Sequence, residues 1–123
     1  MSSVRSGHFS ADIHTASGLE SFRMMVGLRH YLRKGVHSIE AVNDKGEGFY
    51  VYLPDDIKTG TYQLEIGLPS IIHVTDCSEA ELYPVGSLTL TVGGGGQFSG
   101  TFSGTDADGI QIANGSFRLE RQA

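Results

Sequence analysis

Five histidines are the side chains of this sequence best suited to bind a metal ion or to exchange a proton near neutral pH. They are His8, His14, His30, His37 and His73. None of them stands at a compact ligand spacing from another histidine or from the single cysteine, so a zinc site would have to be assembled from separate strands. His30 lies in phase with apolar neighbours, which favours a core histidine over a metal ligand.

Two carboxylates in a tight turn are the second candidate for metal chemistry. Asp106 and Asp108 precede Gly109, and carboxylate oxygens suit a hard cation such as calcium. The turn lacks the rest of the EF-hand ligand set, including its bidentate glutamate. The pattern therefore favours an ordinary acidic turn, with Asp106 and Asp108 as the candidate metal residues.

The sequence offers little for nucleophilic chemistry. Cys77 would act as a nucleophile only if a neighbouring base favoured its thiolate. Asp76 and Glu79 stand close to it and disfavour that form, so we expect Cys77 to be a small, partly buried hydrophobic residue. The glycine run 93–96 lacks the Lys-Ser/Thr pair of a phosphate-binding loop and favours a hairpin loop. No nucleophile elbow or His-Glu-x-x-His motif is present, and no catalytic residue is assigned.

Tyrosines and arginines form a candidate binding surface. Tyr50 and Tyr52 alternate with apolar residues, which places them on the outer face of a strand. Tyr31 lies between two arginines in the same way. If these strands are close in the sheet, the candidate binding residues are Arg29, Tyr31, Arg33, Tyr50 and Tyr52. Tyrosine and arginine are enriched at protein-binding hot spots, but the same residues also pack well across strands without any partner.

The elements that must position these residues are β-strands, because apolar side chains recur at every second position. Turn signals separate the runs, among them the residues 43–48 and 106–109. The pattern predicts one all-β domain over residues 6–121, a largely antiparallel β-sandwich or β-barrel of about eight to nine strands. Residues 1–5 and 122–123 are expected to be flexible termini.

Three segments allow two interpretations. Residues 18–34 carry a helix-capping pattern, but their apolar positions fall on one face only in a strand, which we prefer. Residues 76–82 offer cap residues and helix formers and predict a short helix. Residues 114–116 (Asn-Gly-Ser) suit either a type I′ hairpin turn or a glycine bulge within one long final strand.

Bulk composition narrows the function classes. The chain has 123 residues and a net charge of −5, and its acidic body argues against a nucleic-acid partner. One cysteine excludes an intrachain disulfide. No signal peptide and no apolar run long enough to span a bilayer is visible. We therefore expect a cytoplasmic protein without a membrane span and without a cofactor.

A set of short motifs lies between residues 60 and 120. They are Gly-x-Tyr-x-Leu at 60–64, Gly-x-Leu-x-Leu at 86–90, Gly-Thr-Phe at 100–102 and Gly-x-Phe at 115–117. In this order they resemble a family of small bacterial β-sandwich domains, many of them lipoproteins. The resemblance implies the sandwich fold and no catalytic residue. The chain departs from the lipoproteins of that family by lacking a lipid-attachment cysteine at its start.

Three functions remain open at this level. The preferred one is a non-catalytic binding or protein-interaction module, whose partner is a protein, a second copy of the chain or a small ligand. The second is an enzyme whose site is assembled from dispersed histidine, aspartate and glutamate residues, which predicts a pocket with several titratable groups. The third is a structural homodimer that pairs through exposed sheet edges.

Overall fold

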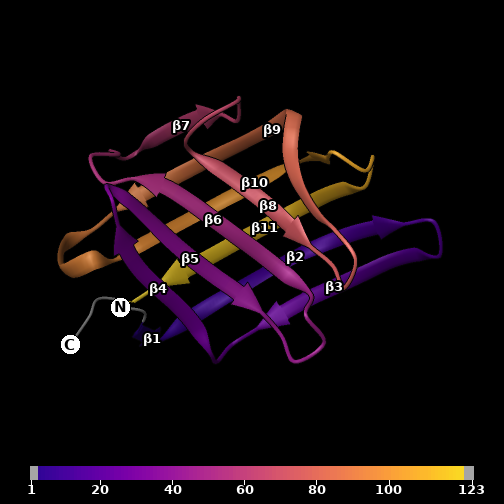
Figure 1. Cartoon of the computed structure of the whole chain (residues 1–123), viewed down its shortest axis with the longest axis horizontal. Helices are drawn as coiled ribbons and strands as arrows, with labels where there is room; N and C mark the ends of the chain where they lie inside the picture. The colour runs from indigo at the N-terminus through magenta and orange to yellow at the C-terminus, as the bar shows by residue number, and fades with distance from the viewer. Residues whose placement is uncertain (1–2, 121–123) are drawn as a thin grey trace.

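A computed structural model describes residues 3–120, which fold into antiparallel strands joined by turns (Figure 1). The strands are β1 (Ser3–Arg5), β2 (Gly7–Thr15), β3 (Gly18–Met24), β4 (Leu28–Arg33), β5 (Val36–Val42), β6 (Gly48–Pro54), β7 (Gly60–Gln63), β8 (Ser70–Val74), β9 (Glu79–Val92), β10 (Phe98–Asp106) and β11 (Gln111–Leu119). A 3-10 turn, η1 (Gly94–Gly96), joins β9 to β10 at the glycine run. The predicted all-β, antiparallel class is confirmed.

The strands belong to one curled sheet. Their order is β1-β4-β5-β6-β8-β9-β10-β11-β2-β3, and β7 pairs with β9. The 14-residue β9 takes part in both layers, because its first residues pair with β8 and its later residues pair with β10. Figure 1 shows β4, β5, β6 and β8 crossing in front of β10, β11, β2 and β3. The shape is a half-barrel rather than a closed sandwich.

The number of strands was underestimated from the sequence, since the described residues contain eleven rather than eight or nine. One additional strand is β1, which pairs with β4. It lies in the segment 1–5 that was expected to be flexible, and its Arg5 is buried. The other arises because residues 18–34 form two strands. Residues 1–2 and 121–123 lie outside the described part of the chain.

The preference for strand over helix at residues 18–34 is confirmed, but the chain turns between β3 and β4. Gly27 has a φ of 82°, a conformation that glycine adopts without steric cost. Before the turn the chain pairs with β2, and after it with β1 and β5. Val26 continues the apolar alternation in the sequence but is 79% exposed, because the strand has already ended.

The prediction of a short helix at residues 76–82 is wrong. The chain makes a tight turn in which the Thr75 N–H donates to the Ser78 carbonyl, and β9 begins at Glu79. Ala80 and Leu82 are buried in the core, so pairing with β8 outweighs the local helix propensity. Tertiary contacts decide the structure of this segment.

The final strand is continuous, so the glycine-bulge interpretation of residues 114–116 is correct. The pairing of β11 with β2 shifts register between Ala113 and Ser116, and Asn114 has a φ of 54°. A Cβ at Gly115 would lie 2.5 Å from the Phe102 ring. The bulge therefore allows an aromatic ring to pack directly on the backbone.

Phenylalanine rings from both layers fill the core. Phe9 lies 5.3 Å from Phe49 and 5.6 Å from Phe117, measured between ring centroids. Phe22 and Phe102 pack around them, and all five are buried. Burial of each such side chain contributes roughly 1.5–3 kcal/mol. The core occupies the middle of the half-barrel and leaves polar residues at its two ends.

Candidate functional site

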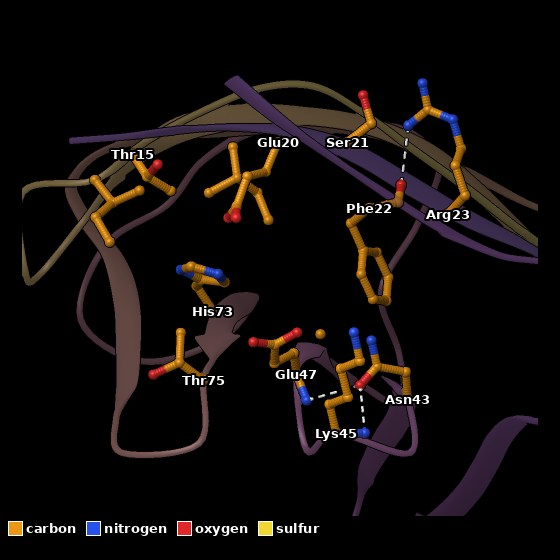
Figure 2. Close-up of a pocket in the computed structure, with 13 residues that line it drawn as sticks. Thr15, Glu20, Ser21, Phe22, Arg23, Asn43, Lys45, Glu47, His73 and Thr75 are labelled. Atoms are coloured by element: carbon orange, nitrogen blue, oxygen red, sulfur yellow. Dashed lines mark hydrogen bonds between the residues drawn. The ribbon is translucent and has the colours of Figure 1, made fainter. Parts of the chain in front are cut away.

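A pocket of about 480 Å³ opens at one end of the half-barrel, between β2, β3, β8 and the turn that joins β5 to β6 (Figure 2). We call it the His73 pocket. Apolar side chains form part of its wall, namely Ile13, Phe22 and Ile110. Its polar lining includes Thr15, Glu20, Asn43, Lys45, Glu47, His73 and Thr75. A pocket with an apolar wall and a few convergent polar groups is the usual form of a ligand site.

The Glu20 side chain lies on the inner face of the sheet. Glu20 pairs with Ile13 across β2 and β3, and Ile13 is buried on the inner face. Directly opposed residues of two strands project to the same side of a sheet. Figure 2 shows the Glu20 carboxylate above the His73 ring. Glu20 is exposed at this open end of the half-barrel, so its carboxylate lines the pocket while it stays in contact with solvent.

The basic side chains of the rim are placed differently. Arg23 donates to the Phe22 carbonyl at 2.9 Å and lies 3.8 Å from the Asp12 carboxylate. Its guanidinium therefore turns away from the pocket, as Figure 2 shows. Lys45, on the turn between β5 and β6, is exposed but lines the pocket, and Figure 2 shows its side chain reaching toward it. Among the described residues, neither Glu20 nor Glu47 forms an ion pair, so both carboxylates are available to a ligand.

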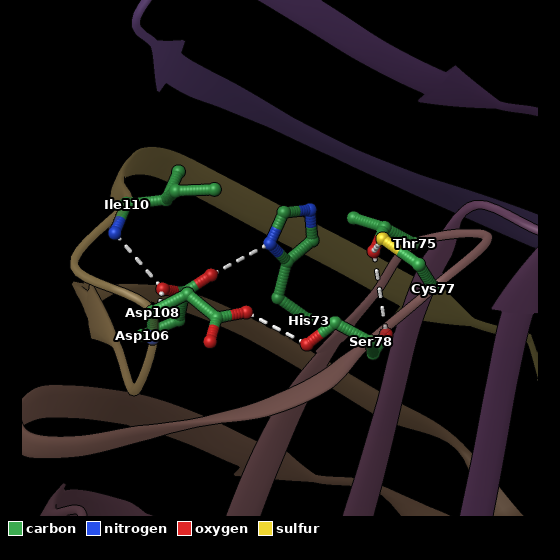
Figure 3. Close-up of polar contacts among 7 residues, drawn as sticks. All are labelled: His73, Thr75, Cys77, Ser78, Asp106, Asp108 and Ile110. Atoms are coloured by element: carbon green, nitrogen blue, oxygen red, sulfur yellow. Dashed lines mark hydrogen bonds and ion pairs between the residues drawn. The ribbon is translucent and has the colours of Figure 1, made fainter.

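His73 and Asp106 form a buried pair at the floor of this end (Figure 3). The Asp106 Oδ2 atom lies 2.8 Å from Nδ1 of His73, and their side chains are 0% and 5% exposed. The other oxygen, Oδ1, accepts the backbone N–H groups of Asp108 and Ile110, each at 2.9 Å. The carboxylate is thus held from both sides. Phe49 stacks on the imidazole with 5.1 Å between ring centroids, which fixes the ring plane.

The contact with Asp106 determines which ring nitrogen of His73 carries the proton and which one can accept a hydrogen bond in the pocket. A carboxylate only accepts hydrogen bonds, so in the neutral imidazole Nδ1 carries the proton and donates it to Asp106. The second nitrogen, Nε2, then has a free lone pair. Within the described residues Nε2 makes no hydrogen bond, and His73 lines the pocket. The His73 pair therefore presents an acceptor to any bound molecule.

Two threonine hydroxyls add acceptor capacity. Thr15 Oγ1 donates to the Gly18 carbonyl at 2.9 Å, and Thr75 Oγ1 donates to the Ser78 carbonyl at 3.5 Å. Each hydroxyl has thereby used its one hydrogen and keeps a lone pair. With Nε2 of His73 and the two carboxylates, the pocket is rich in acceptors.

The two residues of the candidate metal turn lie close to this pocket but are engaged by the protein. Both oxygens of Asp106 accept hydrogen bonds, as described above, and Oδ2 of Asp108 accepts from the Ser78 hydroxyl at 2.7 Å. Among residues 3–120 no group of three or more histidine, cysteine, aspartate or glutamate side chains is placed to hold a metal ion. A metal site at Asp106 and Asp108 stays a prediction.

Cys77 lies near the pocket rim and is exposed, so the expectation of a partly buried residue is wrong. Its Sγ atom lies 3.8 Å from the Thr75 hydroxyl (Figure 3). The turn between β8 and β9 carries the side chain outward. No base within the described residues contacts the thiol.

The predicted tyrosine and arginine residues lie together on the outer face of the front layer. Strand β5 separates β4 from β6, and the register places Tyr31, Ser38 and Tyr52 in one row across them. The next row contains Arg29, Glu40 and Tyr50. We call the surface formed by these two rows the tyrosine face. It is a sheet face without a deep pocket among those found in the described residues.

Hydrogen bonding and burial tune the phenols of the tyrosine face. The Tyr31 hydroxyl donates to Oε2 of Glu40 at 2.7 Å, and this bond is the main cause that raises the Tyr31 pKa. Burial raises the pKa of Tyr52 to about 12, with further contributions from Tyr31 and Tyr50. Burial also raises the pKa of Tyr50, helped by Glu79 and Glu40. All three phenols stay neutral donors and acceptors at physiological pH.

A second polar cluster occupies the other end of the half-barrel, and we call it the Arg5 cluster. Arg5 donates to the Gly96 carbonyl at 2.9 Å and to Nδ1 of His30 at 3.2 Å. The second nitrogen of His30 lies 3.0 Å from Nδ1 of His37. Burial, then the charge of Arg5, lowers the pKa of His30 to about 4. His30 faces inward as the sequence predicts, in a network that the sequence did not reveal.

Sequence reasoning missed Glu20 and Glu47 and did not connect His73 with Asp106. The signal for Glu20 was available, since it stands two residues before Phe22 and therefore shares its inward phase. Glu47 lies in a turn, where no periodicity applies. The contact between His73 and Asp106 joins residues 33 positions apart, and it depends on a strand order that periodicity does not contain.

Comparison of the chain with family models, with curated proteins and with solved structures found no match. Within the described residues, no helix has the length and apolar character needed to cross a membrane.

Proposed function

We propose that this domain binds a small molecule in the His73 pocket, and that the ligand carries a positively charged, hydrogen-bond-donating group such as a primary amine. One observation carries the proposal: Nε2 of His73 and the Glu20 carboxylate approach the same pocket from opposite layers of the half-barrel (Figure 2). The observation supports the non-catalytic binding function expected from the sequence. Cytoplasmic location and the lack of a nucleic-acid partner remain predictions from the sequence.

The chemistry of the lining favours an ammonium group over other polar groups. An ammonium has three N–H donors and no acceptor, which matches Nε2 of His73 and the carboxylates of Glu20 and Glu47. Hydrogen bonds to charged groups contribute roughly 1.5–3 kcal/mol, more than neutral ones. Phe22 and Ile13 offer an apolar wall to the body of the ligand.

A matched set of probes tests this assignment. Isothermal titration calorimetry near neutral pH compares 2-phenylethylamine with 2-phenylethanol and phenylacetate, which share the aromatic body and differ in the head group. We expect the amine to bind about tenfold more tightly than the alcohol, because it adds a charge-assisted bond. The anion should bind least, since it faces two carboxylates.

Two variants connect binding to the pocket. Glu20→Gln keeps the size of the side chain and removes its charge. It should weaken binding of the amine about tenfold and change binding of the alcohol little. Glu65→Gln, an exposed acid outside the pocket, is the matched control and should bind like the wild type. Equal affinities for amine and alcohol, no amine binding at millimolar concentration, or an unaffected Glu20→Gln variant would each contradict the proposal.

The His73 pair also favours a second function, catalysis with His73 as general base. An imidazole held by a carboxylate, with its other nitrogen in a pocket, is the arrangement that accepts a proton from a substrate or a water molecule. The methyl ester of phenylalanine carries the amine and the aromatic body and offers a bond for hydrolysis. Hydrolysis that His73→Gln abolishes would support the enzyme. Binding of this ester without turnover would leave the binding function alone.

A further inference from the structure

Opposite charges lie at equal distances on the two sides of β6, the central strand of the front layer. One row of outward side chains runs from Arg29 in β4 through Glu40, Tyr50 and Ile72 to Glu81 in β9. Tyr50 lies on β6, which is the middle of these five strands. Strands lie about 4.8 Å apart, so Arg29 and Glu81 stand about 10 Å from β6 on opposite sides.

Neither end of this row is neutralised by an ion pair. Among the described residues Arg29 forms no ion pair, and Glu81 has only a 3.3 Å hydrogen bond from the Ser70 hydroxyl. Glu40, the cross-strand neighbour of Arg29, accepts the Tyr31 hydroxyl instead. Figure 1 shows that no strand or turn of residues 3–120 lies over the outer face of β5 and β6. The row therefore offers a cation, an aromatic centre and an anion to a partner.

We propose that the tyrosine face binds a second copy of this chain, in a symmetric dimer whose two-fold axis runs along β6 in the plane of the interface. Such an axis places β4 of one copy on β9 of the other. Arg29 then meets the partner's Glu81, and the same contact occurs twice, as a two-fold interface requires. Tyr50 and Tyr52 lie at the axis and pack against their own copies.

The charges also exclude the other simple arrangement. A two-fold axis perpendicular to the strands would place β4 on β4 and bring Arg29 against the partner's Arg29. Like charges opposed across an interface are costly. The axis along β6 is thus the one that pairs opposite charges, and tyrosine at its centre agrees with the composition of interface cores.

The size of the face limits the strength of this dimer. Five strands of about six residues cover about 500 Å² of sheet, less than the ~800 Å² per partner of a standard stable interface. The sheet also curves away from β6, so the long side chains of Arg29 and Glu81 must span the gap. We therefore expect a weak dimer that forms at high protein concentration.

Charge exchange tests the pairing directly. Sedimentation equilibrium up to about 1 mM protein, a concentration suited to a weak interface, should show dimers of the wild type. Arg29→Glu alone and Glu81→Arg alone should both be monomeric, because each opposes like charges twice. An equal mixture of the two variants should form a heterodimer, since both contacts then join opposite charges. Lys58→Glu, the same change of charge at an exposed position outside the two rows, is the matched control and should dimerise like the wild type.

Other outcomes overturn the proposal. A wild type that stays monomeric at the highest concentration excludes this dimer. A dimer that persists in Arg29→Glu and in Glu81→Arg lies elsewhere, with the exposed sheet edges as the alternative. Tyr50→Ser/Tyr52→Ser should also be monomeric, and circular dichroism establishes that each variant is folded. The test is independent of the His73 pocket, because none of these residues lines it.

Discussion

The two polar clusters of the half-barrel both contain histidine, but the histidines have different partners and different roles. His37 pairs with Leu53 and His73 pairs with Phe49, so the clusters lie about four residues apart along β6, or about 13 Å. In the Arg5 cluster, histidines contact an arginine and one another. In the His73 pair, the histidine contacts a carboxylate on one side and a pocket on the other. In each cluster, the group that contacts one ring nitrogen of the histidine determines whether the other nitrogen can bind a ligand.

The difference has a physical consequence for each cluster. Arg5 has donors directed at backbone carbonyls of η1 and of Glu120, so the Arg5 cluster ties β1 to the remainder of the fold. Asp106 orients His73 and leaves Nε2 for a ligand. Changes in the Arg5 cluster should therefore affect stability, and changes in the His73 pair should affect binding.

The largest effect is expected from Arg5→Met. The substitution keeps an apolar stem but leaves the Gly96 carbonyl and Nδ1 of His30 without their donor, so we expect the free energy of unfolding to fall by about 3 kcal/mol. Urea unfolding followed by circular dichroism measures this. Arg33→Met, on the exposed end of β4, is the control and should stay within about 0.5 kcal/mol of the wild type. An unfolding midpoint for Arg5→Met equal to that of the wild type would remove the distinction between the clusters.

A smaller effect is expected from pH. The pKa of His30 is about 4 in the folded chain and about 6.5 when unfolded. The unfolded state therefore binds the proton more readily, so stability is complete above about pH 6.5 and declines as the pH falls toward 4. His30 is half-buried, and after solvent screening we expect a loss of about 1 kcal/mol.

The substitution His30→Gln checks the origin of this decline. Glutamine still offers an acceptor to Arg5 but does not titrate, so the free energy of unfolding should depend less on pH between 6.5 and 4. His14→Gln, at an exposed position outside the cluster, is the matched control. A His30→Gln variant with the same pH dependence as the wild type would assign the decline to other groups.

The sequence predicted much of the strand content and of the tyrosine face, because both depend on local alternation. Tyr50 and Tyr52 stand out of phase with Phe49 and Val51, and the structure places them on the outer face. The break at Gly27 was missed because Val26 keeps the apolar phase after the strand has ended. Periodicity measures where a side chain would point, and it does not show where pairing stops.

The candidate pocket was largely beyond sequence reasoning. His73 and Asp106 were each considered alone, the first as a ligand and the second as part of an acidic turn. Their contact requires β8 and the end of β10 to lie at one end of the half-barrel, which follows from the strand order. Glu20 is a partial exception. Its inward position within β3 could be predicted from the alternation, but its neighbours in the pocket could not.

The smallest effect on stability is expected from Asp106→Asn, which acts on the His73 pair itself. The amide oxygen can still accept the N–H groups of Asp108 and Ile110, so we expect stability within about 1 kcal/mol of the wild type. The amide nitrogen now donates to Nδ1 of His73, which moves the imidazole proton to Nε2. The pocket then presents a donor where it had an acceptor, and amine binding should weaken about tenfold.

The measurement that tests the central claim is the long-range proton–nitrogen NMR spectrum of the His73 imidazole, recorded with and without 2-phenylethylamine. We expect a proton on Nδ1 and a bare Nε2 in the wild type, with the Nε2 signal shifting when the amine is added, and the opposite tautomer in Asp106→Asn. A proton on Nε2 in the wild type, or an Nε2 signal that the amine does not move, would contradict the claim that His73 receives a cationic ligand.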